Sequence, residues 1–296
     1  MQITDKVFVV TGAGNGIGRE VTLELLRRGG RVAGVDLRAE SLEETARLAG
    51  ARDRFTAHPL DITDHDGVGA LPEQVLAAHG QVDGLVNVAG IIQKFVTFEE
   101  LDEKEMRRVM EVNFWGTVNT CHAFLPHLLA RPAGSVVNVS SMGGFVPVPG
   151  QTLYGASKAA VKLLTEGLYA ELRDTKVDVS VVFPGGVSTS ITENSGVTAP
   201  GGAGAPPEQV ATEAAAGSPT PGAGAAKPTD GKGKKQAEPQ TITPQEAARI
   251  IVENAVEKGA YRVTAGKDST TMDRISRLSP KRATDMIAKQ MAALLG

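Results

Sequence analysis

Tyr154 and Lys158 are the residues whose types and spacing most directly suggest chemistry, because they stand four positions apart in the run 154–158. On a helix this spacing places both side chains on one face, one turn apart. A phenol is a poor base near neutral pH because its ordinary pKa is about 10, but a neighbouring ammonium group lowers that pKa. Such a pair can accept a proton from an alcohol or donate one to a carbonyl. The same spacing also arises by chance on amphipathic helices, so the surrounding sequence must decide.

A glycine-rich turn lies near the start of the chain. Residues 6–10 are predicted to form a buried strand, and residues 19–28 show the apolar spacing of a helix. Glycines between them let the main chain approach a pyrophosphate, and the helix N-terminus supplies N–H groups and partial positive charge. This order of elements predicts a dinucleotide phosphate site. Its candidate contacts are Gly12, Asn15, Gly16, Ile17 and Gly18.

The second predicted strand, residues 31–35, ends in Asp36. A carboxylate in this position can accept hydrogen bonds from both hydroxyls of the adenosine ribose, and it repels a 2′-phosphate. Asp36 therefore favours NAD over NADP. Arg38, two residues further on, could weaken that preference. The alternative is that Asp36 is an ordinary surface residue after a strand.

The next predicted strands also end in candidate ligands of a dinucleotide. After the third strand, residues 54–60, a polar side chain and an apolar neighbour could hold the adenine ring. After the fourth strand, residues 82–88, small residues would let a cofactor lie across the strand ends. The candidate contacts at these two places are Asp61, Ile62, Asn87, Ala89 and Gly90.

Two further polar residues lie where a ligand is expected. Ser141 follows the fifth predicted strand, residues 135–139, and doubly wound folds bind ligands at the carboxyl ends of their strands. Asn113 stands among apolar neighbours in a long helical region, residues 99–130. A polar amide in that setting is either a satisfied core residue or a functional one.

Strands alternate with helices along most of the chain. This rhythm predicts one Rossmann-like α/β domain over residues 1–296, a doubly wound parallel sheet of about seven strands with helices on both faces. The carboxyl edge of such a sheet brings together the phosphate turn, the ribose carboxylate, Ser141 and Tyr154. That convergence turns the Tyr/Lys pair from a weak motif into a strong one.

The composition is that of an ordinary globular protein. Among 296 residues, 41% are hydrophobic and the formal net charge is -3, which gives no electrostatic reason to expect nucleic acid or an anionic membrane as partner. The single cysteine, Cys121, suits a reducing compartment and is expected to be buried. No secretory leader, membrane-length apolar run or metal-ligand spacing of the five histidines is visible, so a cytoplasmic protein without a metal is expected.

The chain resembles the classical short-chain dehydrogenase/reductase family over about residues 5–190, with a looser fit from about residue 241. One departure from the family pattern is Val88, where a second asparagine is usual. It does not touch the predicted chemistry. The motifs that carry the resemblance are Thr11-Gly12-x-x-x-Gly16-x-Gly18, Asn87-x-Ala89-Gly90, Asn113, Ser141, Tyr154-x-x-x-Lys158 and Pro184-Gly185.

The resemblance implies a role for each matching polar residue. Tyr154 would be the general acid/base, and Lys158 would lower its pKa and hold the nicotinamide ribose. Ser141 would hydrogen-bond the substrate oxygen and the negative charge that develops on it. It is preferred to Ser140 because the family serine lies thirteen residues before the tyrosine. Asn113 would hold a water that links Lys158 to solvent.

The resemblance also implies contacts at the end of a sixth predicted strand, residues 177–183. Pro184 and Gly185 would lie against the cofactor, Thr189 would bind the nicotinamide carboxamide, and the main chain near Val187 would assist. The family further implies a homodimer or homotetramer.

The C-terminal third differs in composition. Residues 196–240 contain no aromatic, Leu, Ile or Met residue, which predicts a low-complexity flexible insertion. The resemblance places this insertion in the region of the substrate lid. A helix over 243–258, a seventh strand over 261–264 and two helices around Pro280 follow. The last helix is amphipathic and basic. Packing on its own domain or on a second subunit is preferred to contact with a membrane surface.

The sequence thus predicts an NAD(H)-dependent oxidoreductase that interconverts a secondary alcohol and a ketone, with Tyr154 as general acid/base. The loop after Ser141 is rich in apolar residues, which favours a substrate with a hydrophobic body. Two alternatives stay open. One is an NADP-dependent carbonyl reductase, and the other is a dinucleotide-sensing binding protein of the same fold without turnover.

Overall fold

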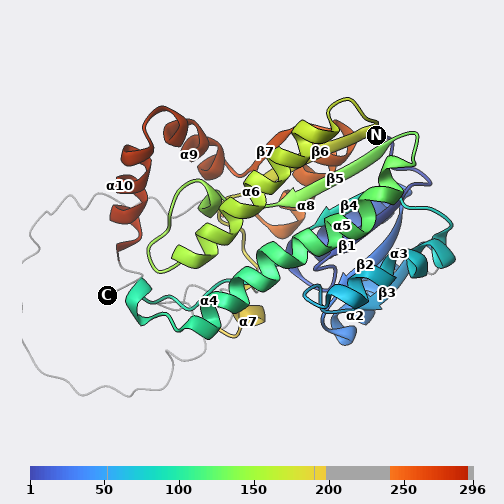
Figure 1. The fold of residues 1–296 in the computed structure, drawn as a ribbon, viewed down its shortest axis with the longest axis horizontal. Coiled ribbons are helices and arrows are strands. Elements are labelled where there is room, and N and C mark those ends of the chain that lie inside the picture. Colours follow the sequence, from blue (N-terminus) through green and yellow to red (C-terminus); the bar gives the residue numbers. More distant parts are fainter. Residues whose placement is uncertain (52, 190, 198–240, 293–296) are drawn as a thin grey trace, which may run out of the picture.

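Seven parallel strands form one sheet in the order β3-β2-β1-β4-β5-β6-β7 (Figure 1). The computed structural model describes residues 1–51, 53–189, 191–197 and 241–292. Most strands are buried along almost their whole length, as parallel strands covered on both faces must be. The strands are β1 (Val7–Thr11), β2 (Arg31–Asp36), β3 (Phe55–Pro59), β4 (Gly84–Asn87), β5 (Gly134–Val139), β6 (Val177–Pro184) and β7 (Arg262–Ala265).

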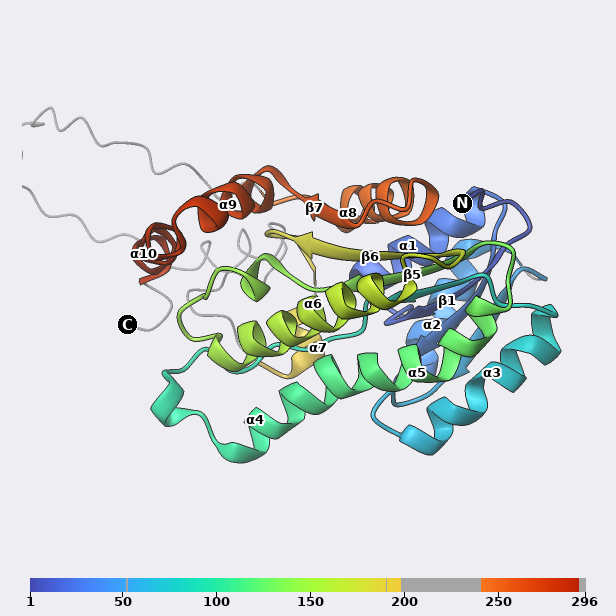
Figure 2. The ribbon, with the colours of Figure 1, turned by 45° about the horizontal axis from the view of Figure 1, so that its top comes forward.

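Helices cover both faces of this sheet (Figure 2). On one face α1, α2 and α8 pack on the strands, and on the other face α3, α5 and α6 do so. The α-helices are α1 (Gly16–Arg27), α2 (Ala39–Ala49), α3 (His65–His79), α4 (Glu103–Met110), α5 (Gly116–Leu129), α6 (Thr152–Leu172), α7 (Ile191–Ser195), α8 (Pro244–Ile250), α9 (Lys267–Leu278) and α10 (Pro280–Gln290). The remaining helical turns are the 3-10 turns η1 (Phe98–Glu100) and η3 (Met142–Gly144) and the π-turns η2 (Glu111–Trp115) and η5 (Ile251–Glu257).

The predicted doubly wound sheet is confirmed, and each predicted strand lies within about two residues of the expected bounds. The predicted helix start at residue 243 is also confirmed, because Thr243 forms a capping box with Glu246 at the start of α8. At the start of α3 the Asp64 side chain accepts a hydrogen bond from the Gly67 N–H at 3.1 Å and caps the helix.

Two helical segments differ from the prediction. The region 99–130 is not one helix but is divided into η1, α4, η2 and α5, with the π-turn η2 carrying Asn113. The segment 243–258 likewise changes from α8 into the π-turn η5. Helix α2 is an element for which no prediction was made. It has no side-chain cap, since Arg38 stands at its N-cap, and it buries only Leu42 and Thr45.

The C-terminal helices pack on the protein itself. Ala283 and Ile287 of α10 and Met272 of α9 form a buried cluster with Val146, which lies in the loop after η3. Packing of the amphipathic last helix on its own domain is therefore confirmed. Of the predicted insertion 196–240, all but residues 196–197 lies outside the described residues.

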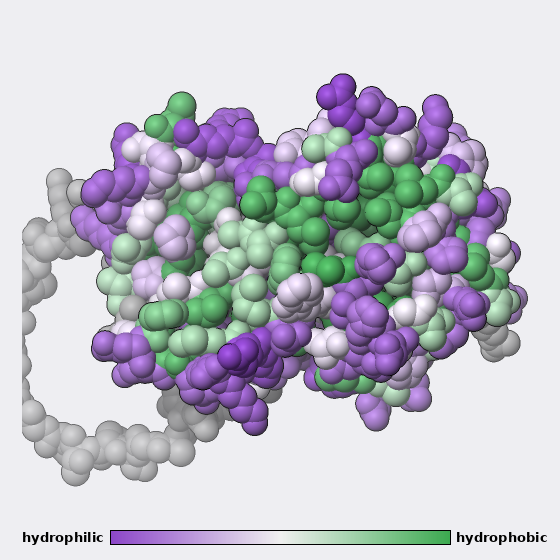
Figure 3. Space-filling model, in the orientation of Figure 1, coloured by the Kyte–Doolittle hydropathy of each residue, from purple (hydrophilic) through white to green (hydrophobic). Residues whose placement is uncertain are grey.

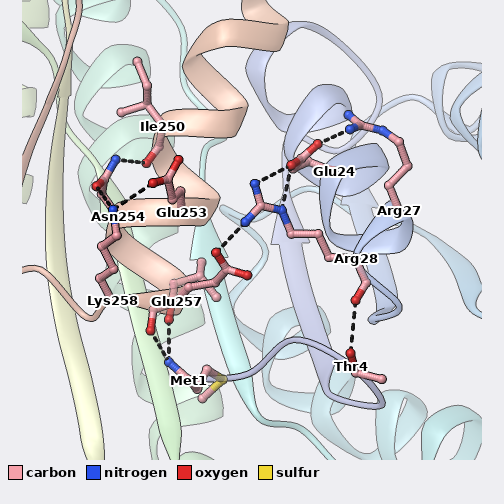
Figure 4. A network of polar contacts seen from close by, with 11 residues as sticks. Met1, Thr4, Glu24, Arg27, Arg28, Ile250, Glu253, Asn254, Glu257 and Lys258 are labelled. Atoms are coloured by element: carbon pink, nitrogen blue, oxygen red, sulfur yellow. Dashed lines mark hydrogen bonds and ion pairs between the residues drawn. The ribbon is translucent and has the colours of Figure 1, made fainter.

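A polar network joins the region after β6 to the start of the chain (Figure 4). The main-chain nitrogen of Met1 donates to the carbonyls of Val256 and Glu257, which end the π-turn η5 and lack helical partners. Arg28, at the end of α1, forms ion pairs with both Glu24 and Glu257. These contacts fix α8 and η5 beside α1, the helix that begins at the glycine-rich turn.

Among the described residues, no helix is long and apolar enough to cross a membrane. Within those same ranges no group of three or more His, Cys, Asp and Glu side chains could hold a metal ion. Cys121 is buried as expected, and burial raises the pKa of its thiol to about 12. It is a packing residue and not a nucleophile.

Candidate active site

The carboxyl edge of the sheet opens between β1 and β4, the adjacent strands at which the strand order reverses. Doubly wound folds bind ligands at this switch point. The glycine-rich turn lies here, and two of its glycines have no room for a side chain. A Cβ on Gly12 would lie 2.9 Å from the Ala89 nitrogen, and one on Gly18 would lie 2.1 Å from the Gly12 carbonyl oxygen. The turn is thus held directly against the end of β4.

Asn15, Gly16 and Ile17 lie at the start of α1, where the phosphate site is predicted. The Asn15 side chain caps the helix by accepting from the Gly16 N–H at 2.6 Å. Gly16 has a φ of 51°, which favours glycine. Ile17 follows in the first turn, where N–H groups lack helical acceptors and partial positive charge gathers.

Asp36 lies beside the same turn. One of its carboxylate oxygens accepts from the Gly14 N–H at 2.9 Å, and the other accepts from the Arg38 N–H at 3.1 Å. The Arg38 guanidinium does not pair with Asp36, because it donates to the Asn194 side chain on α7 at 2.6 Å. The carboxylate at the end of β2 therefore faces the phosphate turn, and the neighbouring cation is held by another element.

The expected adenine contacts lie at the end of β3. The Asp61 carboxylate is exposed and accepts from both the N–H and the hydroxyl of Thr63, at 2.9 and 2.8 Å. The Ile62 side chain is buried against Gly116, since a Cβ on that glycine would lie 2.5 Å from the isoleucine methyl carbon. Asp61 is thus accessible, whereas Ile62 serves packing with its side chain.

Buried hydrogen bonds fix the main chain after β4. The Asn87 side chain donates to Asn138 at 2.9 Å and accepts from Thr120 at 2.8 Å. The Thr11 hydroxyl accepts from the N–H groups of Val88 and Ala89 at 3.1 and 3.2 Å. These contacts tie the segment 87–90 to the strand that leads into the glycine-rich turn.

Tyr154 and Ser141 come together at this edge. A Cβ on Gly143 would lie 3.4 Å from a ring carbon of Tyr154 and 3.5 Å from the Ser141 hydroxyl oxygen, and that oxygen accepts from the Gly143 N–H at 3.0 Å. The expected lowering of the Tyr154 pKa by Lys158 is wrong. Desolvation by burial raises the pKa of Tyr154, and the nearby Ser141 hydroxyl opposes that effect only in part. Burial also lowers the pKa of Lys158, so both groups of the pair are shifted toward their neutral forms.

Lys158 lies one turn along α6 and is buried. Burial lowers its pKa to about 8, so this ammonium group gives up its proton more readily than an exposed lysine. It donates to the Val139 carbonyl at 3.1 Å. A Cβ on Gly90 would lie 3.0 Å from the lysine nitrogen and 3.1 Å from the Asn113 side-chain oxygen. Lys158 and Asn113 therefore meet above Gly90.

Asn113 is completely buried and fully hydrogen-bonded. Its side chain accepts from the Ile91 N–H at 2.8 Å and donates to the Ile91 carbonyl and the Ser157 hydroxyl, both at 2.9 Å. Ser157 in turn donates to the Tyr154 carbonyl at 2.7 Å. Asn113 thus braces the segment after β4 against α6. The π-turn that carries it is a local distortion often found at functional sites.

The sequence interpretation missed Gln93, which is completely buried after β4. Its side-chain oxygen accepts from the N–H groups of Leu153 and Tyr154 at 2.7 and 3.0 Å, and its amide donates to the Gly150 carbonyl at 2.9 Å. The N-cap residue of α6, Gln151, gives its own helix no side-chain cap. Gln93 therefore caps the helix that carries Tyr154 from a distant loop. A glutamine after two isoleucines was the only sequence signal.

The loop after β6 reaches the phosphate turn. Pro184 ends the strand, and the Gly185 N–H donates to the Ala265 carbonyl at 2.9 Å. Val187 pairs with Ile242 in an isolated bridge. A Cβ on Gly16 would lie 3.5 Å from the Thr189 methyl carbon, so the loop lies over the start of α1. The strand-end segments predicted to bind a cofactor, after β1, β2, β3, β4 and β6, thus all lie at the carboxyl edge of the sheet.

A small apolar cavity of about 250 Å³ lies between the loop after Ser141 and the N-terminal part of α6. Phe145 and Pro147, from the loop expected to form the substrate pocket, line this cavity, but neither Ser141 nor Tyr154 is among its lining residues. Val146 instead turns into the cluster formed with α9 and α10. The cavity is lined by Gly143, Gly144, Phe145, Pro147, Gln151, Thr152, Gly155, Ala156 and Ala159.

Sequence comparisons identify similar proteins. The profile of the short chain dehydrogenase family matches residues 6–199. A Mycobacterium tuberculosis protein named as an oxidoreductase, SadH, is 32% identical over 301 residues, which cover 97% of this chain and 95% of that protein. The 3-oxoacyl-(acyl-carrier-protein) reductase FabG of Thermotoga maritima is 34% identical over 194 residues, which cover 65% of this chain and 78% of the reductase.

Solved structures share the fold. A short-chain dehydrogenase/reductase from Burkholderia phymatum, in complex with NAD, has a TM-score of 0.75 at 24% identity and covers 95% of this chain and 96% of its own. A short chain dehydrogenase from Burkholderia cenocepacia, in complex with NADP, has a TM-score of 0.72 at 26% identity, with 97% and 99% covered. The seven-stranded sheet with helices on both faces is common to this group.

Proposed function

Because this chain belongs to the short-chain dehydrogenase family, we propose that it is an NAD(H)-dependent oxidoreductase that interconverts a secondary alcohol and a ketone. The observation that carries the proposal is that the Tyr154 ring and the Ser141 hydroxyl both lie beside Gly143 at the carboxyl edge of the sheet, with Lys158 buried one turn away. A hydroxyl donor, an acid/base and a cation at one place suit the movement of a proton to and from an alcohol oxygen.

The residues at this edge fit a nicotinamide dinucleotide. The Gly12 and Gly18 positions have no room for a Cβ, because Gly12 lies against the end of β4 and Gly18 lies against the Gly12 carbonyl. Glycines at these positions allow the main chain to approach a pyrophosphate closely. The helix N-terminus at Gly16 provides donors for phosphate oxygens, and Asp36 provides acceptors for ribose hydroxyls. Lys158 is proposed to hold the nicotinamide ribose, and Thr189 the carboxamide.

Hydride transfer is the chemistry that the cofactor supplies when bound. Ser141 is proposed to donate a hydrogen bond to the substrate oxygen, where negative charge develops as the ketone is reduced. Tyr154 donates its proton to that oxygen in reduction and removes it in oxidation. Lys158, whose pKa is about 8, is a suitable source for reprotonation of the phenolate, and Asn113 fixes the segment beside it.

The preference for NAD rests on the Asp36 carboxylate, which faces the phosphate turn, and on the Arg38 side chain, which is held by Asn194. Asp36→Ala removes acceptors for the ribose and the charge that repels a 2′-phosphate. The affinity for NADH should fall about tenfold, and that for NADPH should rise. Fluorescence titration with both cofactors measures the change. Asp61→Ala is the control at the next strand end, and equal affinities of Asp36→Ala and wild type for both cofactors would refute the ribose assignment.

The test of the proposed reaction is formation of NADH from NAD in the presence of a panel of secondary alcohols, together with NADH titration. Alcohols on a hydrophobic body are the first choice, because the loop after Ser141 is rich in apolar residues. Turnover of one or more members supports the proposal. Tight binding of NADH without turnover of any alcohol, or of the corresponding ketones, would support a dinucleotide-binding protein instead.

A homo-oligomer is proposed to form through the face that carries α5 and α6, where apolar residues gather (Figure 3). Leu163 of α6 is 68% exposed and Trp115 of η2 is 48% exposed. Leu163→Glu should lower the molar mass measured by light scattering, because a buried charge without a partner opposes association. Leu278→Glu, at an exposed leucine of α9, is the control. A wild-type monomer, or an unchanged mass of Leu163→Glu, would contradict the prediction.

A further inference from the structure

We propose that Asp268 is a positioning residue that holds the turn 185–189 in the shape required to take a nicotinamide. Asp268 lies in the first turn of α9, beyond the residues that match the family profile. The inference rests on the proposed cofactor, because it assigns the nicotinamide end to this turn. It concerns a contact between two segments that are 82 positions apart in the sequence.

The carboxylate of Asp268 is bound to the main chain of the turn. One oxygen accepts from the Gly186 N–H at 2.8 Å. A Cβ on Gly185 would lie 2.1 Å from the other oxygen, and a Cβ on Gly266 would lie 2.4 Å from it. The carboxylate therefore fills the space above two glycine α-carbons, and no other residue could stand at either position without displacing it.

The second carboxylate oxygen is buried and has no hydrogen-bond partner among the described residues. Burying an acceptor without a hydrogen-bond partner costs free energy. The Asp268 side chain fills the space between the end of β6 and the start of α9. A smaller side chain would remove the buried unpaired oxygen, but it would leave the turn 185–189 without support on this side.

Neighbouring contacts limit how the turn can move. Ser269 donates from its hydroxyl to the Phe183 carbonyl at 2.7 Å and anchors α9 to β6. On the other side, the Ile242 N–H donates to the Gly186 carbonyl at 2.9 Å, and the Ser188 N–H donates to the Ile242 carbonyl at 3.1 Å. The turn is thus held between Asp268 and residue 242, and loss of one side frees it to shift toward the other.

A shift of this turn would act on the nicotinamide end and not on the adenosine end. Val187 and Thr189 lie in the turn, whereas Asp36 and the glycine-rich loop are fixed by β1, β2 and β4. Affinities for ligands with and without the nicotinamide therefore distinguish the proposed role of Asp268 from a general loss of structure. ADP-ribose keeps the adenosine, the pyrophosphate and both riboses and lacks only the nicotinamide, so it is the reference for every contact except those of the nicotinamide.

The experiment compares affinities of the full chain for NADH and for ADP-ribose by calorimetric or fluorescence titration. Asp268→Ala should weaken NADH binding about tenfold and leave ADP-ribose binding within about twofold of wild type. Asp268→Asn keeps both the shape and the acceptor for the Gly186 N–H, so it should restore NADH affinity to within about threefold. Thr270→Val is the matched control on α9, because it removes the hydrogen bonds of Thr270 to Thr264 and to the Gly266 carbonyl and leaves the bonds of Asp268 and residue 242 to the turn in place.

Equal weakening of both ligands by Asp268→Ala, or no weakening of either, would overturn the inference. So would an equal loss of NADH affinity in Thr270→Val. If Asp268→Ala does not fold, as judged by thermal unfolding, Asp268→Ser is measured with the same expectations. A wild-type chain that binds neither ligand would refute the proposed function itself, which keeps the two failures apart.

Discussion

Tyr154→Phe is expected to lower kcat for secondary-alcohol oxidation by about 10²–10⁴-fold, the range that a positioned acid/base contributes. Removal of one oxygen deletes the group proposed to exchange a proton with the substrate. The ring remains, so NADH affinity should stay within about twofold of wild type. Steady-state kinetics and NADH titration measure the two effects separately.

Tyr169→Phe is the matched control for this variant. Tyr169 lies on the same helix α6, is partly exposed, and contacts the Tyr261 ring with its own ring, which phenylalanine retains. It should leave kcat unchanged. If Tyr154→Phe kept the wild-type kcat, the acid/base role of Tyr154 would be wrong, whatever its effect on binding.

The second large effect is expected from Gln93→Met, which keeps the length of the side chain and removes its polar atoms. The N–H groups of Leu153 and Tyr154 and the Gly150 carbonyl would then lose their partners in a buried place. At about 1–3 kcal/mol for each unsatisfied group, the free energy of unfolding should fall by about 3 kcal/mol or more. Because the start of α6 is no longer fixed, kcat should fall about 10–100-fold.

Urea denaturation and kinetics of the folded variant test this expectation, with Gln151→Met as the control. Gln151 is also buried, but its side chain donates to the Gln93 carbonyl, and among the described residues it caps no N–H group of α6. The control should lose less stability and keep its kcat. A Gln93→Met variant that is less stable but has the wild-type kcat would limit Gln93 to a role in folding.

The sheet could be predicted from sequence because its strands are short, buried apolar runs that recur between helical segments. Once the strands were placed, the residues at their carboxyl ends were already candidates, since parallel strands end at one edge. Asp36, Asn87 and Ser141 were found in this way. The structure brings all three to that edge.

Features that depend on distant contacts could not be predicted in this way. The π-turn at Asn113 has no local signal, because its side chain is held by Ile91 and Ser157 from other elements. Gln93 caps α6 across 60 positions of sequence. The same cause explains the wrong direction for the tyrosine pKa. A spacing of four residues shows that a cation is near, but the extent of burial, which raises the pKa of Tyr154, follows only from the packed structure.

The central claim is tested most directly by following deuterium from the carbinol carbon of a secondary alcohol into the cofactor. The purified chain is incubated with NAD and the labelled alcohols of the panel, and the reduced cofactor is analysed by mass spectrometry. Direct hydride transfer predicts labelled NADH and ketone in equal amounts from wild type, and almost none from Tyr154→Phe. Unlabelled NADH, equal labelling by wild type and variant, or no NADH from a chain that binds the cofactor would contradict the proposed function.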